Sequence, residues 1–243
     1  MYYDFEIDGG SGKQVHFIFV DTVLLTGNSD VFDENGMLVK EQTGRELGEY
    51  FRETSDEETR AKADDQWKWI ESTLEKSTAD FVIVAGHYPV YSICEHGPTS
   101  ELVEKMIPLL ERYNVTAYLN GHDHCAQTVT VSGIDYHTIG SAHLNDPSTA
   151  HKDRIPNDSL RFHATGAVGG YGAIDFDSDG NLVVTHYDGD GTVLYSAPGR
   201  SPRTSSFCTG VKCMFLSLCS KLTEFIRCDT HMYTEEKEGR TQR

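Results

Sequence analysis

The chain has 243 residues, a length that suits one large domain, or one and a half small ones, with a buried core. It carries 21 Lys and Arg against 38 Asp and Glu, which gives a formal net charge of −17. Residues 1–200 carry a net charge of −19, whereas residues 201–243 carry +2. An acidic body repels phosphate backbones, so we expect no nucleic-acid partner. A small anionic substrate is not excluded, because a bound metal can reverse the field locally.

Targeting and membrane signals are absent from the pattern. The residues from Met1 to Glu6 offer neither a basic stretch nor an apolar one, so no signal peptide is expected in this chain. The longest apolar run, Phe81–Ala85, has the length of a strand, so no membrane span is expected. Six cysteines occur without a C-x-x-C pair, which leaves a structural zinc ribbon unsupported and the redox compartment undecided.

The predicted elements of the first 125 residues alternate between strand and helix. Runs of β-branched and aromatic residues predict buried strands at 15–20, 81–85 and 115–119. Between them, apolar residues at helical spacing predict an amphipathic helix from Trp67 to about Lys76. This alternation is typical of an α/β fold.

Two further features concern the predicted helices of the first 125 residues. The acidic run at 53–65 is typical of a solvated face or a loop. A second helix is predicted to open at Pro98–Glu101, which supplies a hydroxyl cap and an acid in the first turn. Pro108 is expected to kink that helix, because it lacks the amide hydrogen that a helix interior needs.

The second half of the chain predicts antiparallel β structure. Ser-Gly and Asp-Gly turns divide two stretches of alternating residues, which predicts hairpins at 128–139 and 173–186 and a further strand at 192–195. No periodicity follows Ser201. We therefore assign residues 1–200 to one domain and residues 201–243 to a Cys-containing tail outside the core.

Two of the predicted strands end in Gly-His. One ends in Gly86-His87, and the other in Gly121-His122-Asp123-His124. Loops just past strand ends are where α/β folds bind ligands, and imidazole binds borderline metals. Each motif alone is more often a chance occurrence or a surface loop; together they predict a metal cluster. In His122-x-His124 each ring could serve a different one of two neighbouring metals, the arrangement that clamps phosphoryl oxygens.

These two motifs belong to a longer series of motifs that occur in order along the chain. They are Asp21-Thr22-Val23, Gly27-Asn28-Ser29-Asp30, Val84–Val90, Glu95–Thr99, Val115–His124, Leu160–His163 and Gly169-Gly170-Tyr171. Over roughly residues 2–200 this series resembles the tartrate-resistant purple acid phosphatases, within the calcineurin-like metallophosphoesterases. The resemblance implies a four-layer αββα fold, hydrolysis of phosphomonoesters at acid pH, and a secreted or lysosomal parent protein. The implied substrate is a small phosphomonoester or a phosphoprotein.

The resemblance also implies roles for the histidines. A binuclear centre would contain iron with zinc or with a second iron. His87 and His122 would ligate the divalent metal, His124 would ligate the ferric iron, and His96 would lie near the substrate phosphate.

The departures from the family pattern are equally specific. The family's Gly-Asp-x-Gly, Gly-Asp-x-x-Tyr and Gly-Asn-His motifs, which supply most of the remaining ligands and the catalytic histidine, do not occur. We therefore expect a partial domain with its N-terminal half missing, and we assign no catalytic residue. The chain is expected to be inactive alone and to pair with a complementary N-terminal half. Thr26 and Glu101 stand at the positions of the family's disulfide, which is expected to be absent. The alternative is a non-catalytic metal-binding, regulatory or interaction domain on the same scaffold.

Overall fold

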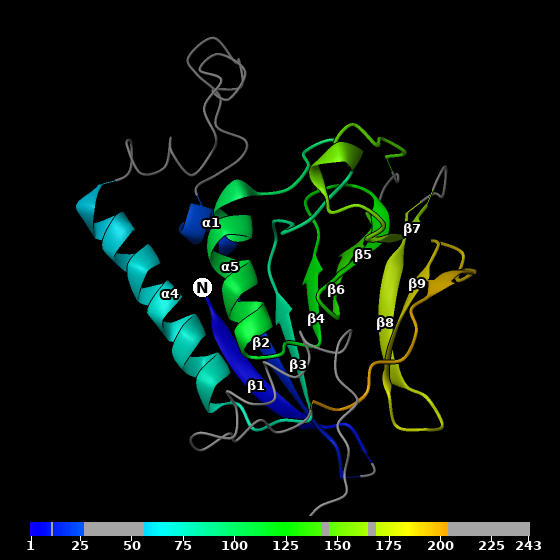
Figure 1. The fold of residues 1–243 in the computed structure, drawn as a ribbon, viewed down its shortest axis with the longest axis horizontal. Helices are drawn as coiled ribbons and strands as arrows, with labels where there is room; N and C mark the ends of the chain where they lie inside the picture. Colours follow the sequence, from blue (N-terminus) through cyan, green and yellow to red (C-terminus); the bar gives the residue numbers. More distant parts are fainter. Residues whose placement is uncertain (11, 27–55, 142–145, 165–168, 204–243) are drawn as a thin grey trace, which may run out of the picture. The chain divides into compact units, whose positions relative to one another are not determined.

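The computed structural model describes residues 1–10, 12–26, 56–141, 146–164 and 169–203 (Figure 1). These residues belong to one compact unit. The predicted turn at 27–30 and the tail beyond Arg203 lie outside the described residues, so the assignment of 201–243 to a separate tail stays a prediction. None of the helices described is both long enough and apolar enough to cross a bilayer.

A mixed sheet of seven strands forms the centre of the described structure. Its strands are β1 (Tyr3–Asp8), β2 (Gln14–Phe19), β3 (Phe81–Ala85), β4 (Ala117–Asn120), β5 (Ala126–Val131), β6 (Ile134–Ile139) and β7 (Leu160–His163). The spatial order is β1-β2-β3-β4-β6-β5-β7. Strands β2, β3, β4 and β6 pair in parallel, whereas β1, β5 and β7 join by antiparallel pairing. The parallel strands therefore end at the same edge of the sheet.

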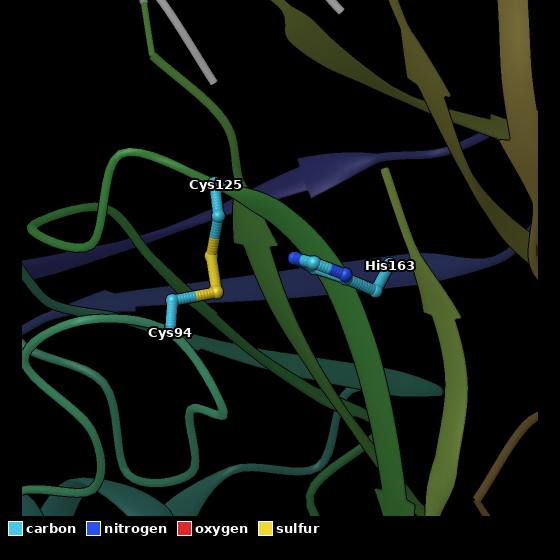
Figure 2. A group of neighbouring side chains, drawn as sticks. All are labelled: Cys94, Cys125 and His163. Atoms are coloured by element: carbon cyan, nitrogen blue, oxygen red, sulfur yellow. A yellow bond between two sulfur atoms is a disulfide. The ribbon is translucent and has the colours of Figure 1, made fainter. Parts of the chain in front are cut away.

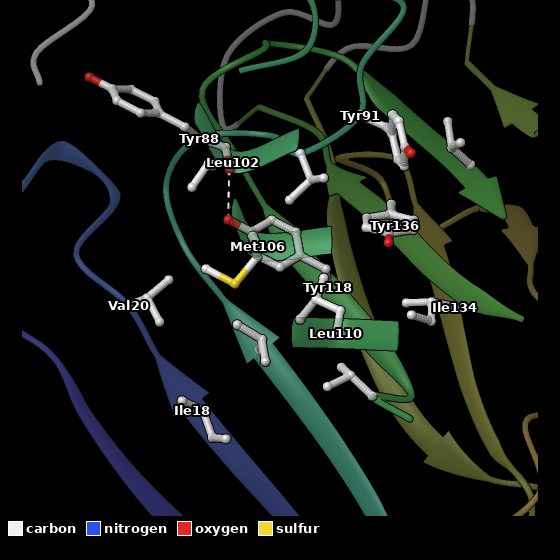
Figure 3. Packing of buried hydrophobic residues seen from close by; sticks show 14 of the residues in the cluster. Ile18, Val20, Tyr88, Tyr91, Leu102, Met106, Leu110, Tyr118, Ile134 and Tyr136 are labelled. Carbon is white, nitrogen blue, oxygen red and sulfur yellow. Dashed lines mark hydrogen bonds between the residues drawn. The ribbon is translucent and has the colours of Figure 1, made fainter. Parts of the chain in front are cut away.

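Two helices cover one face of this sheet. They are α4 (Glu57–Lys76) and α5 (Ser100–Arg112), accompanied by the short α1 (Thr22–Thr26) (Figure 1). Both helices bury a stripe of side chains against the sheet, including Ile70 on α4 and Met106 on α5. Figure 3 shows Met106 and Leu110 beside Tyr118 of β4, with Ile18 of β2 in the same cluster.

A second sheet lies on the other face. It consists of β8 (Tyr171–Phe176), β9 (Leu182–Tyr187) and β10 (Val193–Ser196), in the order β10-β9-β8. Leu182 and Val184 of β9 pack against Phe81 and Ile83 of β3, and this cluster closes the space between the sheets. The helices, the large sheet and the small sheet form three successive layers, which confirms the α/β fold class.

The expected elements are present, and the structure extends them. Helix α4 begins at Glu57, ten residues before the predicted start, because Asp56 caps it by accepting a hydrogen bond from the Thr59 amide. Part of the acidic run is therefore the solvated face of a helix. Helix α5 continues through Pro108 to Arg112. The edge strands β1 and β7 and the 3-10 turn η1 (Lys152–Arg154) were not predicted.

Candidate metal centre

The carboxyl ends of the parallel strands bring two histidines together. His87 follows β3 and His122 follows β4, and these strands are neighbours in the sheet. The Nδ1 atom of His122 lies 3.3 Å from Nε2 of His87, and the two ring centroids are 5.1 Å apart. The exposed ring of His96 lies 4.4 Å from that of His122, centroid to centroid. The structure thus gathers three of the four predicted site residues at one edge of the sheet.

Backbone hydrogen bonds fix the two Gly-His turns to each other. The Gly86 amide donates to the Leu119 carbonyl at 3.0 Å, and the Gly121 amide donates to the His87 carbonyl at 3.2 Å. The buried hydroxyl of Tyr118 donates to the Tyr88 carbonyl at 2.9 Å (Figure 3). The backbone that carries His87 is therefore held on both sides by β4.

His122 adopts an unusual backbone conformation. Its φ angle is +66°, in the left-handed region that favours glycine and costs other residues on the order of 1 kcal/mol or more. Strain of this kind persists where surrounding contacts over-determine the backbone, and it is common at functional sites. Here the turn is closed by the Asp123 amide, which donates to the Gly121 carbonyl at 2.8 Å.

The two side chains after His122 point to different environments. Asp123 is buried, and its Oδ1 accepts a hydrogen bond of 2.8 Å from the His96 amide, so it anchors the loop that carries His96. The side chain of His124 is exposed, while its carbonyl accepts a hydrogen bond from the Asp146 amide. Among the described residues, His124 belongs to no group of three metal-ligand atoms within 4.8 Å of one another. The structure therefore does not bring His124 together with His87 and His122 in one such group.

A disulfide joins the two loops of the site. It links Cys94, two residues before His96, to Cys125, the residue after His124 (Figure 2). No partner for either cysteine was predicted from the sequence. The signal that could have found this bridge is the position of each cysteine beside a candidate site residue, because loops that meet at one site bring such neighbours within reach.

A second histidine pair lies in the core and was also missed. His137 on β6 and His186 on β9 are buried, with Nδ1 and Nε2 3.2 Å apart. The Thr128 hydroxyl lies 3.0 Å from His137 and 3.1 Å from His186. Burial lowers the pKa of His137 to about 3 and that of His186 to about 4, so both rings are neutral at mildly acid pH. Inward-facing positions in two strands were the only sequence signal for this pair.

The donor set at the sheet edge fits one divalent ion. Two imidazole nitrogens on a tetrahedral zinc, at Zn–N distances of about 2.0 Å, lie about 3.3 Å apart, which is the separation found between His87 and His122. A ferric ion needs anionic oxygen ligands. Among the described residues, no carboxylate completes a group of three with these two rings.

Comparison with known proteins decides the family. The family model described as calcineurin-like phosphoesterase matches residues 4–126. The chain belongs to this family. It is 37% identical to tartrate-resistant acid phosphatase type 5 of Rattus norvegicus, over 79% of this chain and 55% of that protein. The chain thus spans about half the length of the curated relatives it matches.

Solved structures support the same fold. The GAP50 anchor of the inner membrane complex of Plasmodium superposes with a TM-score of 0.62 at 20% identity, over 85% of this chain and 56% of that one. The purple acid phosphatase PPD1 from yellow lupin, Lupinus luteus, gives a TM-score of 0.51 at 15% identity, over 86% and 36%. At these identities the likeness concerns the fold alone. The recognition of this phosphoesterase family from the sequence motifs is confirmed.

Proposed function

We propose that this chain supplies the divalent-metal side of a binuclear phosphomonoesterase centre. The observation that carries the proposal is the 3.3 Å separation of ring nitrogens in His87 and His122, at the carboxyl ends of parallel strands in an acid phosphatase relative. In this proposal both rings ligate one divalent ion. That ion, when bound, polarises a phosphoryl oxygen and lowers the pKa of a bound water.

His96 and His124 take the remaining roles in this proposal. The exposed ring of His96 contacts His122 and is free to donate to phosphate oxygens, while the Asp123 carboxylate holds its backbone. His124 is a ligand of the second metal, an iron. A ferric ion next to His124 needs anionic oxygen ligands, and we assign these to a complementary N-terminal half.

The proposed substrates are small phosphomonoesters or phosphoproteins, and the proposed setting of the whole protein is secreted or lysosomal. The chain alone is expected to be inactive. Loss of one metal removes much of the stabilisation of the phosphoryl transition state, and loss of a general acid costs roughly 10²–10⁴-fold.

A titration of the full chain with its Cys94–Cys125 disulfide intact, by Zn(II) and followed by calorimetry, tests the metal ligands. One equivalent should bind at the histidine pair, and His87→Ala or His122→Ala should weaken this binding at least about tenfold. His96→Ala is the matched control, because His96 is assigned to phosphate rather than metal. Equal affinity in the wild type and in the His122→Ala variant would contradict the ligand assignment.

A phosphatase assay distinguishes the proposed half of an enzyme from the alternative, a non-catalytic domain. With iron and zinc added, the chain should not turn over a chromogenic phosphomonoester at pH 5. Turnover that disappears in the His122→Ala or His124→Ala variant would show that this half of the site suffices. The alternative is a one-metal binding or interaction domain. It predicts no activity even after a complementary half is supplied.

A further inference from the structure

Strand pairing places His163 beside Cys125. In the β5–β7 ladder His163 is the partner of Gln127, and the Ala164 amide donates to the Ala126 carbonyl at 2.8 Å. Residues two apart along a strand share a face, as do directly paired residues. Cys125 directly precedes β5, and Figure 2 shows it on the side to which the His163 ring points.

A separate loop brings Cys94 to the same place. The Ile93 amide donates to Oε1 of Gln127 at 3.1 Å, which ties this loop to β5. Nδ1 of His151 donates to the Cys94 carbonyl at 2.7 Å, and the Cys94 amide donates to the Ser92 hydroxyl oxygen at 3.1 Å. Both cysteines are fully buried. The ligand atoms of Cys94, Cys125 and His163 all lie within 4.8 Å of one another.

The imidazole of His163 has an unsatisfied nitrogen in this cluster. Its Nε2 is buried and has no hydrogen-bond partner among the described residues. A buried, unpaired polar atom costs about 1–3 kcal/mol. The ring faces the two sulfurs in Figure 2, so an ion held by all three side chains would give this nitrogen a partner.

We propose that Cys94, Cys125 and His163 form a zinc site when the two cysteines are reduced, and that the disulfide excludes the ion. Two thiolates and one imidazole are ligands that Zn(II) favours, with water in the fourth position. The sulfurs, bonded in the structure described, separate to about 3.8 Å around a tetrahedral ion with Zn–S distances of about 2.3 Å. None of these ligands belongs to the His87–His122 pair, so this inference does not depend on the proposed phosphatase function.

The redox step balances with a dithiol reductant. Two electrons and two protons pass from the dithiol, which becomes a disulfide, to the Cys94–Cys125 bridge, which becomes two thiols. Each thiol then releases one proton to solvent as its sulfur binds the ion. Oxidation by a disulfide of higher potential reverses both steps and releases the zinc.

Cobalt spectroscopy tests this site separately from the histidine pair. The full chain, with Cys208, Cys213, Cys219 and Cys228 each replaced by Ser, is purified under a phosphine reductant and shown to contain two free thiols. Co(II) should then give a thiolate-to-cobalt charge-transfer band of one equivalent, and Zn(II) should abolish it. The oxidised chain should give no such band.

Single substitutions test which histidine binds the cobalt ion. His163→Ala, which retains the disulfide and with it a check on folding, should weaken cobalt binding at least about tenfold. His96→Ala and His122→Ala should leave the charge-transfer band unchanged. A reduced chain with two titratable thiols and no band, or a band unaffected by His163→Ala, would overturn the proposal. Loss of the band in His122→Ala would assign the ion to the other site and overturn it equally.

Discussion

At Gly86 the turn after β3 leaves no room for a side chain. A Cβ atom there would lie 2.6 Å from Cγ2 of Thr22 and 2.7 Å from the hydroxyl oxygen of Tyr118. Gly86→Ala should therefore destabilise the fold by about 1–3 kcal/mol, as overpacked core variants do. Urea unfolding measures this difference. Gly121→Ala is the matched control, because its Cβ would meet only Nδ1 of His87 at 3.9 Å; an equal loss in both variants would contradict the steric explanation.

The buried pair of His137 and His186 should make stability depend on pH. Burial holds their pKa values at about 3 and about 4, whereas an unfolded histidine titrates near 6.5. As the pH falls below 6.5 the unfolded chain takes up protons that the folded chain does not, so stability is lost until the pH reaches the folded pKa values. When the pH falls from 7 to 5, each ring should lower the free energy of unfolding by roughly 2 kcal/mol.

Urea unfolding at the two pH values checks this dependence. His137→Gln should reduce the loss between pH 7 and pH 5 by roughly 2 kcal/mol, because the variant has no imidazole there. The charges of Asp135 and Arg200 act on His137 in opposite directions and are unchanged by this substitution. His96→Gln, at an exposed ring, should leave the loss unchanged. An unaltered pH dependence in His137→Gln would contradict the argument.

At the scale of elements, Arg203 joins the carboxyl ends of two helices. Its guanidinium donates to the carbonyl oxygens of Ser77, the C-cap of α4, and Tyr113, the C-cap of α5, at 3.2 Å and 3.0 Å. It also donates to the Ala79 carbonyl at 2.7 Å. A cation at this position satisfies terminal carbonyls and interacts favourably with both helix dipoles.

Arg203→Ala should lower the unfolding free energy by about 2 kcal/mol, the scale of hydrogen bonds to a charged group. Arg203→Lys should recover only part of this loss, because an ammonium cannot reproduce the planar fork of donors. Arg112→Ala is the control: its ion pair with Glu71 is exposed and should contribute less than about 1 kcal/mol. Chemical denaturation distinguishes these variants, and similar losses at both arginines would contradict the capping role.

At the scale of the whole molecule, one end of the large sheet exposes an apolar ladder. Tyr3, Phe5 and Ile7 of β1 are 49%, 42% and 44% exposed. Tyr3 stacks on Phe19, and Phe5 on Phe17, with ring centroids 5.0 Å and 5.4 Å apart. Exposed apolar faces on edge strands favour association. The chain alone should therefore self-associate or pair with a complementary half.

Light scattering after size exclusion checks this expectation. Phe5→Thr should raise the monomer fraction, because it removes an exposed ring while keeping a residue that suits a strand. Glu6→Gln, on the opposite face of β1, should not raise it. A wild-type chain that is monodisperse and melts cooperatively as a monomer would count against the prediction.

Local sequence patterns predicted most of the helices and strands and the position of two candidate site residues. Apolar runs and turn signals predicted the inner strands, the two helices and both hairpins, because burial of one face imposes a period on the sequence. The ordered motifs identified the family and placed His87 and His122 at strand ends. Strand β1 was missed although Tyr3, Phe5 and Ile7 alternate with acids, which is the period of a strand; its residues are exposed on both faces.

Pairings between distant residues were decided only by the tertiary structure. The sequence by itself determined the fold class and the family, and it predicted that His87 and His122 follow neighbouring strands, because these depend on patterns within short segments. Only folding decided that Cys94 bonds Cys125, that His163 faces both sulfurs, and that the ring of His96 lies beside that of His122. Such contacts depend on strand register and loop path, which place side chains to within a few ångströms and which the spacing of residues along the chain does not fix.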